Sequence, residues 1–176
     1  MKKPIHLYIF VTLSTLSTLV NRVWSAFFTN PNTMAEALAE QQASLGVASK
    51  GELLSVYQAA FELQVGMFYK VFAVLLLLAL VVTIVLLFQK KNEQAAYVYI
   101  GYLFGTLVQT VVAYVTTRGI YAGFSNETLR TTYEATTLVS FIFGVVLFTI
   151  YFGLTAFFLF RKPKETPSVA TNATDI

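Results

Sequence analysis

The sequence predicts an all-α integral membrane protein. We expect a four-helix bundle with both chain ends in the cytoplasm and a helical extracytoplasmic segment between the first two helices. Of the 176 residues, 56% are hydrophobic and only 12% are charged, whereas a typical soluble domain carries about 25% charge. Four stretches are long enough to cross the roughly 30 Å hydrocarbon core as helices. Basic residues also gather on one side of these stretches, as they do in membrane proteins of fixed orientation.

The four predicted spans cover residues 5–23, 66–88, 95–116 and 136–160. Because backbone groups in lipid must be hydrogen-bonded within their own segment, we expect each span to be a helix. The second is the most apolar, with 15 Leu, Ile, Val or Phe residues between Val71 and Phe88. The first also fits a signal peptide cleaved near Ser25, which would leave the later spans in the same direction. Residues 1–160 thus form a single transmembrane domain.

The charges in the loops predict the orientation. Seven of the 12 basic residues lie on one side, namely Lys2, Lys3, Lys90, Lys91, Arg161, Lys162 and Lys164. The other side holds five basic residues but six of the nine acidic ones. By the positive-inside rule the first side is cytoplasmic. The polar residues 161–176 are then expected to form a disordered cytoplasmic tail.

Residues 25–65 form the larger extracytoplasmic segment, and two capping boxes predict two short helices in it. Thr33 stands three residues before Glu36, and Ser49 stands three residues before Glu52. A hydroxyl and a carboxylate at this spacing can each accept a hydrogen bond from the first turn of a helix. We therefore expect one helix to begin after Thr33 and another after Ser49.

The second of these short helices has an apolar face, on which Leu54, Tyr57 and Phe61 recur at helical spacing. This face either caps the bundle or the membrane surface, or it is a docking surface for an extracytoplasmic partner. The smaller external segment, residues 117–135, is expected to turn at Gly119 and Gly123. It then restarts as a helix after Ser125, so the fourth helix extends beyond the membrane.

Three of the spans have a small or polar face that suits packing between helices in lipid. The residues expected at helix contacts are Ser14, Thr18, Gly101, Gly105, Ser140 and Gly144. The polar residues inside the third span are Tyr102, Thr106 and Gln109. The second span is almost entirely apolar, and we expect it to face lipid or an apolar partner helix.

Two charged residues lie at the outer boundary of the spans, Arg22 and Lys70. One interpretation is that their long side chains reach out to the interface and anchor the helices. The other is that they bind phosphate headgroups or an anionic substrate. Gln109, in the middle of its span, has a similar pair of interpretations, as a hydrogen-bonding group between helices or as a substrate contact.

Several kinds of chemistry lack the residues that they need. The chain has no cysteine and one histidine, His6, which excludes disulfides, thiolate metal sites and a two-histidine site within one copy. No Asp or Glu lies within a span, so the proton relays of many pumps are missing. We expect neither a metal nor another cofactor, no nucleic-acid partner and no enzymatic activity.

The functional hypothesis is a non-enzymatic membrane subunit that acts by helix–helix association. Its partners would be membrane lipids and another membrane protein, most plausibly a transporter such as an ATP-driven (ABC-type) one. The alternative is a homo-oligomeric small transporter or channel, in which the polar faces line a path. A cysteine-free chain with short loops is typical of a bacterial cytoplasmic membrane, which is the location we expect for this multi-pass protein.

Overall fold

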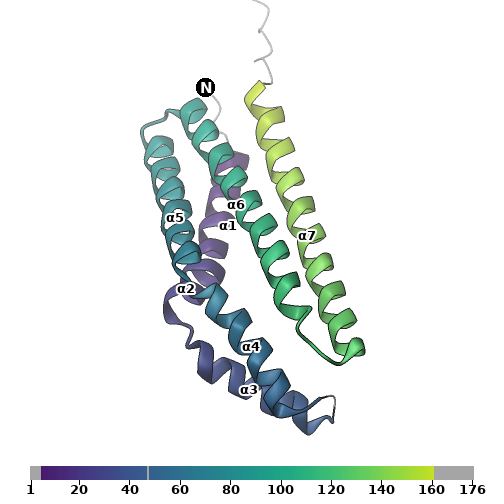
Figure 1. Ribbon diagram of the computed structural model, residues 1–176. Coiled ribbons are helices and arrows are strands. Elements are labelled where there is room, and N and C mark those ends of the chain that lie inside the picture. The colour runs from purple at the N-terminus through teal and green to yellow at the C-terminus, as the bar shows by residue number, and fades with distance from the viewer. Residues whose placement is uncertain (1–4, 47, 161–176) are drawn as a thin grey trace, which may run out of the picture.

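The structure is a computed structural model that describes residues 5–46 and 48–160, in which every regular element is a helix (Figure 1). The elements are α1 (Ile5–Ser17), the π-helical turn η1 (Thr18–Val23), α2 (Trp24–Phe28), α3 (Pro31–Ser44), α4 (Lys50–Gln64), α5 (Met67–Phe88), α6 (Asn92–Tyr121) and α7 (Glu127–Phe160). Helices α1, α5, α6 and α7 run side by side (Figure 1). We call the end of this assembly where α3 and α4 lie the α3–α4 end. The opposite end, where residues 89–91 connect α5 to α6, is the α5–α6 turn end.

The expected all-helical fold is confirmed, and three helical stretches are long and apolar enough to cross a membrane. They are Lys50–Phe88, which combines α4 and α5, Asn92–Tyr121 and Glu127–Phe160. The expected terminal tail, residues 161–176, and the basic residues Lys2, Lys3, Arg161, Lys162 and Lys164 lie outside the described residues.

The first expected span, residues 5–23, is not one continuous α-helix. Its α-helical part ends at Ser17, and the chain continues through η1 into α2. The Thr12 and Thr15 hydroxyls donate to backbone carbonyls four residues earlier, at 2.8 and 2.7 Å, a contact that competes with regular helical bonding and bends helices. The helical run still covers residues 5–28, which is roughly 36 Å at about 1.5 Å per residue.

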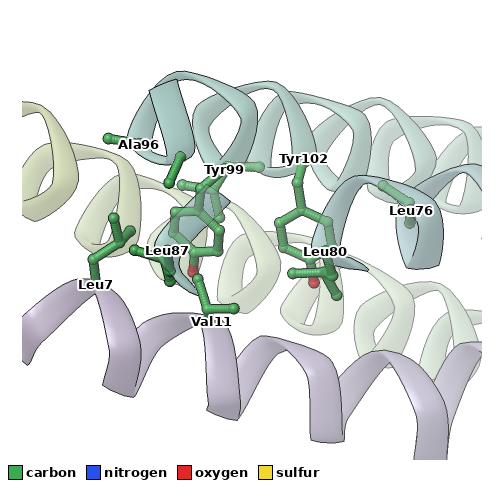
Figure 2. Close-up of a cluster of buried hydrophobic side chains, with 10 residues drawn as sticks. Leu7, Val11, Leu76, Leu80, Leu87, Ala96, Tyr99 and Tyr102 are labelled. Carbon is green, nitrogen blue, oxygen red and sulfur yellow. The ribbon is translucent and has the colours of Figure 1, made fainter. Parts of the chain in front are cut away.

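The first hydrophobic core lies between α1, α5 and α6, with Tyr99 and Tyr102 directed from α6 toward α1 (Figure 2). Its other buried members are Leu7, Val11, Leu76, Leu80, Leu87, Ala95, Ala96 and Leu103. The two tyrosine hydroxyls are paired across helices, Tyr99 with Ser14 Oγ at 2.8 Å and Tyr102 with Thr18 Oγ1 at 2.9 Å. One face of α5 thus meets other helices, while its opposite face is exposed.

A second core at the α3–α4 end joins α3 and α4 to the turn between α6 and α7. Its buried residues are Ala35, Ala39, Leu53, Val56, Tyr57, Phe124 and Leu129. Ile120 and Tyr121 pack against it, which explains why α6 runs on to Tyr121. The prediction of a turn at Gly119 is therefore wrong, because Gly119 lies within α6. The predicted turn at Gly123 and the helix start after Ser125 are confirmed, since α7 begins at Glu127.

The helix starts at this end differ in part from the expected capping boxes. Helix α3 begins at Pro31 rather than after Thr33, because Asn30 Oδ1 accepts from the backbone N–H groups of Asn32 and Thr33, at 3.1 and 3.4 Å. Proline suits the first helical position, where its missing N–H is not needed. The expectation for α4 is confirmed, since Ser49 Oγ accepts from the Glu52 N–H at 3.3 Å.

Helix α7 is the most exposed long element. Only Leu129 and Thr155 of its 34 residues are buried. It packs along α6 (Figure 1), and near its C-terminal end it meets α1 through ring contacts between His6 and Phe158, with centroids 4.0 Å apart, and between Phe10 and Tyr151, 5.0 Å apart. Helices α1 and α7 are therefore in contact at the α5–α6 turn end.

Candidate functional site: a polar cavity between η1, α6 and α7

A cavity of about 470 Å³ lies toward the α3–α4 end, between η1, α6 and α7. Its polar lining consists of Asn21, Arg22, Ser25, Gln64, Tyr69, Gln109, Thr110, Tyr114, Thr117, Tyr121, Tyr133, Thr136, Thr137 and Ser140. Ala113 and Phe141 complete the wall. The volume falls within the range of about 300–1,000 Å³ that is typical of small-molecule sites.

The π-helical turn η1 brings two polar residues to this cavity. Asn21 and Arg22 both lie in η1 and both line the wall. A π turn holds an extra residue per turn relative to the α-helix and is found often at functional sites. Thr18, the first residue of η1, is fixed to α6 by its hydrogen bond to Tyr102. The turn that carries Arg22 is thus attached to the helix that forms the opposite wall.

Gln109 of α6 is the most deeply buried polar residue of the lining, with 5% of its surface exposed. Its Oε1 atom makes no hydrogen bond with any described residue. Buried polar side chains nearly always have a partner, because an unsatisfied acceptor loses its water without compensation. Gln109 therefore has an unfilled acceptor at the inner end of the cavity.

Three of the four threonines of the wall already donate their hydroxyl hydrogens to their own helices. Thr110 Oγ1 donates to the Thr106 carbonyl at 2.8 Å, Thr136 Oγ1 to the Thr132 carbonyl at 2.9 Å, and Thr137 Oγ1 to the Tyr133 carbonyl at 2.8 Å. Each hydroxyl has a single hydrogen, so only the lone pairs of these oxygens are left. These three threonines therefore offer only acceptors to the cavity.

The cavity is open at its rim and reaches the buried Gln109 at its inner end. Asn21, Gln64, Thr136 and Ser140 are exposed, in contrast to Gln109. Toward the α5–α6 turn end, Phe104 of α6 packs against Phe148 and Phe152 of α7, with ring centroids 5.3 and 5.5 Å apart. Beyond Gln109, α7 is thus joined to α6 and to α1 by ring contacts, with Phe104 itself 47% exposed.

The predicted polar residues divide between the cavity and the helix contacts. Arg22, Gln109 and Ser140 line the cavity, and the Ser140 hydroxyl has no hydrogen-bond partner among the described residues. Ser14, Thr18 and Tyr102 lie in the buried α1–α6 contact instead. Thr106 Oγ1 donates to the Leu103 carbonyl at 2.7 Å within its own helix, and Lys70, half-buried, is not part of the lining.

The three glycines predicted at helix contacts differ in how closely a neighbouring helix approaches them. A Cβ atom built on Gly105 would lie 2.9 Å from Leu76 Cδ2, and one on Gly144 would lie 2.9 Å from Thr110 Cγ2. A Cβ on Gly101 would have no neighbour within 4 Å among the described residues outside its own turn. The close approach of α5 to α6 therefore occurs at Gly105, and that of α6 to α7 at Gly144.

The expected docking face of α4 is largely covered by the chain itself. Tyr57 is 4% exposed, and its hydroxyl hydrogen-bonds to that of Tyr133. Leu54 and Phe61 are partly buried against the same second core. Tyr57 therefore belongs to the interior. Of the two interpretations of this face, the packing favours the one in which it caps the bundle, and the cluster that covers it comes from the distant α6–α7 turn, which the local spacing does not reveal.

Sequence reasoning did not single out most of the α6 wall. Thr110, Tyr114, Thr117 and Tyr121 recur at three or four residues, as one face of a helix does. That spacing was a usable signal. The predicted third span ends at residue 116, however, and this helix face continues beyond that point to Tyr121.

Comparison with known proteins adds a family. The family described as Domain of unknown function (DUF8777) matches residues 1–168. The chain belongs to this DUF8777 family. No curated protein and no solved structure matches it. For this DUF8777 member the site must be interpreted from its own geometry, and within the described residues no group of three or more His, Cys, Asp or Glu side chains could hold a metal ion.

Proposed function

We propose that the protein spans the membrane four times, with the α5–α6 turn end in the cytoplasm and the α3–α4 end outside. The helical run from α1 to α2, roughly 36 Å at about 1.5 Å per residue, is long enough for the fourth crossing. Seven of the 12 basic residues then lie on the cytoplasmic side, in accord with the positive-inside rule. The cavity lies in the outer half of this arrangement.

In this orientation the function that the geometry favours is non-enzymatic transport of a small solute. The observation that carries it is the polar cavity, which has an exposed rim toward the outer end and reaches the buried Gln109. A polar, partly open cavity beside apolar helices is a typical solute site, because lipid tails cannot satisfy its polar groups. The four helices of one chain provide about 470 Å³, so an oligomer is not needed to form this site.

Passage through the protein requires α7 to move away from α1. In this structure the rings of His6 and Phe10 contact those of Phe158 and Tyr151. The structure then corresponds to the state that is open to the outside. A second state would separate these rings and close the outer rim, which is how alternating access works around a fixed site.

The test uses the fact that the chain has no cysteine, so that each substitution introduces the only thiol. Ser140→Cys lies at the cavity rim, and its neighbour Val139→Cys is a matched control on the apolar surface of α7, where Val139 is 66% exposed. In proteoliposomes, an impermeant maleimide is applied to the α3–α4 side or to the opposite side.

If the protein is a transporter, we expect Ser140→Cys to be labelled from the α3–α4 side in the present state and from the opposite side in the second state. Val139→Cys, which faces lipid, should be labelled from neither side. Labelling of Ser140→Cys from the α3–α4 side alone would refute passage. No labelling from that side would refute the cavity as a point of entry.

A second candidate is the membrane subunit that associates with another membrane protein, such as an ATP-driven transporter. The observation that favours it is α7, which buries only Leu129 and Thr155 of its 34 residues. Affinity purification of the tagged protein in mild detergent at native expression, with mass spectrometry and mass photometry, tests it. A stoichiometric membrane partner would support the subunit, whereas a homogeneous species of this chain alone would contradict it.

A further inference from the structure

We propose that the cavity binds a small phosphate ester that carries hydroxyl groups, with its phosphate at Arg22 and a hydroxyl at Gln109. This inference rests on the proposed function and deepens it, because it names the chemical class of the solute. It is argued from the charge, the unfilled acceptor and the remaining hydrogen-bonding capacity of the cavity wall.

The charge of the wall comes from Arg22 alone. None of the other lining residues is acidic or basic, and Arg22 forms no ion pair with a described residue. Its side chain is half-buried, so part of its water has been removed without a counter-charge in return. A guanidinium presents several N–H groups in a planar fork that matches the oxygens of a phosphate, and it keeps its charge at any physiological pH.

Gln109 requires a different group from the same ligand. Its Oε1 is buried and has no partner, and it lines the same cavity as Arg22. An acceptor needs a hydrogen-bond donor, which the doubly ionised phosphate group of a phosphate ester does not have. An anion that carries no hydroxyl group, such as sulfate or the dianion of a simple phosphate ester, would therefore satisfy Arg22 and leave Gln109 Oε1 without a donor. The two residues together favour a ligand with an anionic part and a separate donor.

The threonines support the same choice. Thr110, Thr136 and Thr137 donate their hydrogens to their own helices, so they offer acceptor lone pairs to the cavity. Additional hydroxyl groups on the ligand would satisfy them. A polyol phosphate provides an anion at one end and several donors at the other, and both ends fit in about 470 Å³.

This chemistry has two sources, a free polyol phosphate such as glycerol 3-phosphate and the headgroup of a lipid such as phosphatidylglycerol. Both carry a phosphate and free hydroxyl groups. Arg22 lies near the outer end of an apolar run, where in the proposed orientation it comes close to the layer of lipid phosphates. The experiment below therefore includes an arm for each source.

The first arm measures binding to the full-length protein in a neutral detergent by equilibrium dialysis. Glycerol 3-phosphate is compared with methyl phosphate, which has the charge without the hydroxyls, and with glycerol, which has the hydroxyls without the charge. We expect glycerol 3-phosphate to bind roughly tenfold or more tightly than either compound, because methyl phosphate lacks the hydrogen bonds of the hydroxyl groups and glycerol lacks those of the phosphate. Equal binding of glycerol 3-phosphate and methyl phosphate, or of glycerol 3-phosphate and glycerol, would overturn the proposal.

The second arm uses variants. Arg22→Gln should weaken binding of glycerol 3-phosphate by roughly tenfold or more, because a charge-assisted contact is lost. Gln109→Leu should abolish the advantage of glycerol 3-phosphate over methyl phosphate while binding of methyl phosphate persists, an effect that general damage to the fold would not produce. Lys70→Gln removes an equal charge outside the cavity and should leave binding unchanged.

Arg22→Lys keeps the charge and controls for misfolding of Arg22→Gln. Circular dichroism and gel filtration should show both variants folded, with Arg22→Lys retaining more of the binding than Arg22→Gln. Wild-type affinity in a folded Arg22→Gln variant would refute the role of Arg22.

The third arm separates the two sources and separates this inference from the proposed function. Ser140→Cys is labelled with maleimide in vesicles of phosphatidylcholine alone or with added phosphatidylglycerol. Protection by phosphatidylglycerol in the membrane identifies a lipid headgroup, and protection by soluble glycerol 3-phosphate identifies a free solute. If neither compound reduces the labelling, the proposal of a polyol phosphate as ligand is refuted, while the cavity remains an entry point. Absence of labelling in every condition overturns the proposed function itself.

Discussion

The Tyr102 hydroxyl of α6 and Thr18 Oγ1 at the start of η1 lie 2.9 Å apart in the buried contact between these elements. Four residues after Thr18, the same π turn carries Arg22 into the cavity. The wall opposite, with Gln109, belongs to the helix that carries Tyr102. Together with the Ser14–Tyr99 hydrogen bond and the core between α1, α5 and α6, this contact holds the two sides of the proposed site against each other.

Removing this hydrogen bond should have a modest cost in stability. We expect Tyr102→Phe to lower the free energy of unfolding in detergent by about 0.5–1.5 kcal/mol, the usual size for a side-chain hydrogen bond between membrane helices. Tyr97→Phe, at an exposed position of the same helix, is the matched control and should cost less. A double-mutant cycle with Thr18→Val should show that the two losses are not additive. Full additivity would mean that the hydroxyls do not interact.

Gly101 and Gly105 of α6 should respond differently to a larger side chain. Gly105→Leu would overlap Leu76 in the core, so we expect a loss of about 1–3 kcal/mol in unfolding free energy. Gly101→Leu has free space and should gain up to about 1 kcal/mol, because glycine is a poor residue in the middle of a helix. Equal effects of the two substitutions in a denaturant titration would contradict the observed packing.

This difference between Gly101 and Gly105 shows where sequence reasoning stops. Gly101 and Gly105, four residues apart, identify a helix face of small residues, and the helices around it follow from hydropathy and length. Which of these two glycines a neighbouring helix approaches closely depends on the position of Leu76 in α5, and no local sequence pattern predicts that position. The same reason explains Tyr57, whose apolar spacing was recognised but whose partners, Phe124 and Tyr133, come from the far side of the fold.

The candidate site was predictable only in its parts. Arg22 and Gln109 stand out in the sequence as a charge at the membrane boundary and an amide in mid-span. Their convergence on one cavity depends on η1, whose widened turn has no reliable sequence signal. The Thr110 and Thr117 positions were visible as a helical face, but their role follows only when α7 is placed beside that face.

The Glu52 carboxylate links α4 to the segment before α7. Its Oε1 accepts from the backbone N–H of Ser125 at 2.6 Å and of Asn126 at 3.3 Å. We expect Glu52→Ala to cost about 1 kcal/mol, since charge-assisted bonds near the surface are partly offset by solvent. Hydrogen exchange at the Ser125 and Asn126 amides should become faster. Glu36→Ala, at an exposed position of α3, should change neither quantity. Unaltered exchange in Glu52→Ala would show that the link does not hold the segment.

The number of crossings and their direction can be tested with two matched thiols and one tag. Gln41 and Gln89 are both exposed, the first in α3 and the second at the end of α5. With the proposed orientation, an impermeant maleimide should label Gln41→Cys in intact cells, and Gln89→Cys only after permeabilisation, because α5 lies between the two residues. The reverse pattern would invert the orientation, and with it the outward opening of the cavity.

The tag decides whether the segment from α1 to α2 crosses as well. A protease-cleavable tag on the N-terminus should be protected in intact cells, like Gln89→Cys, if that segment is a fourth span. Cleavage of the tag from outside would place the N-terminus with Gln41 and reduce the crossings to three. In that case Arg22 would lie on a segment that does not cross, and the cavity wall that it forms would be at the membrane surface.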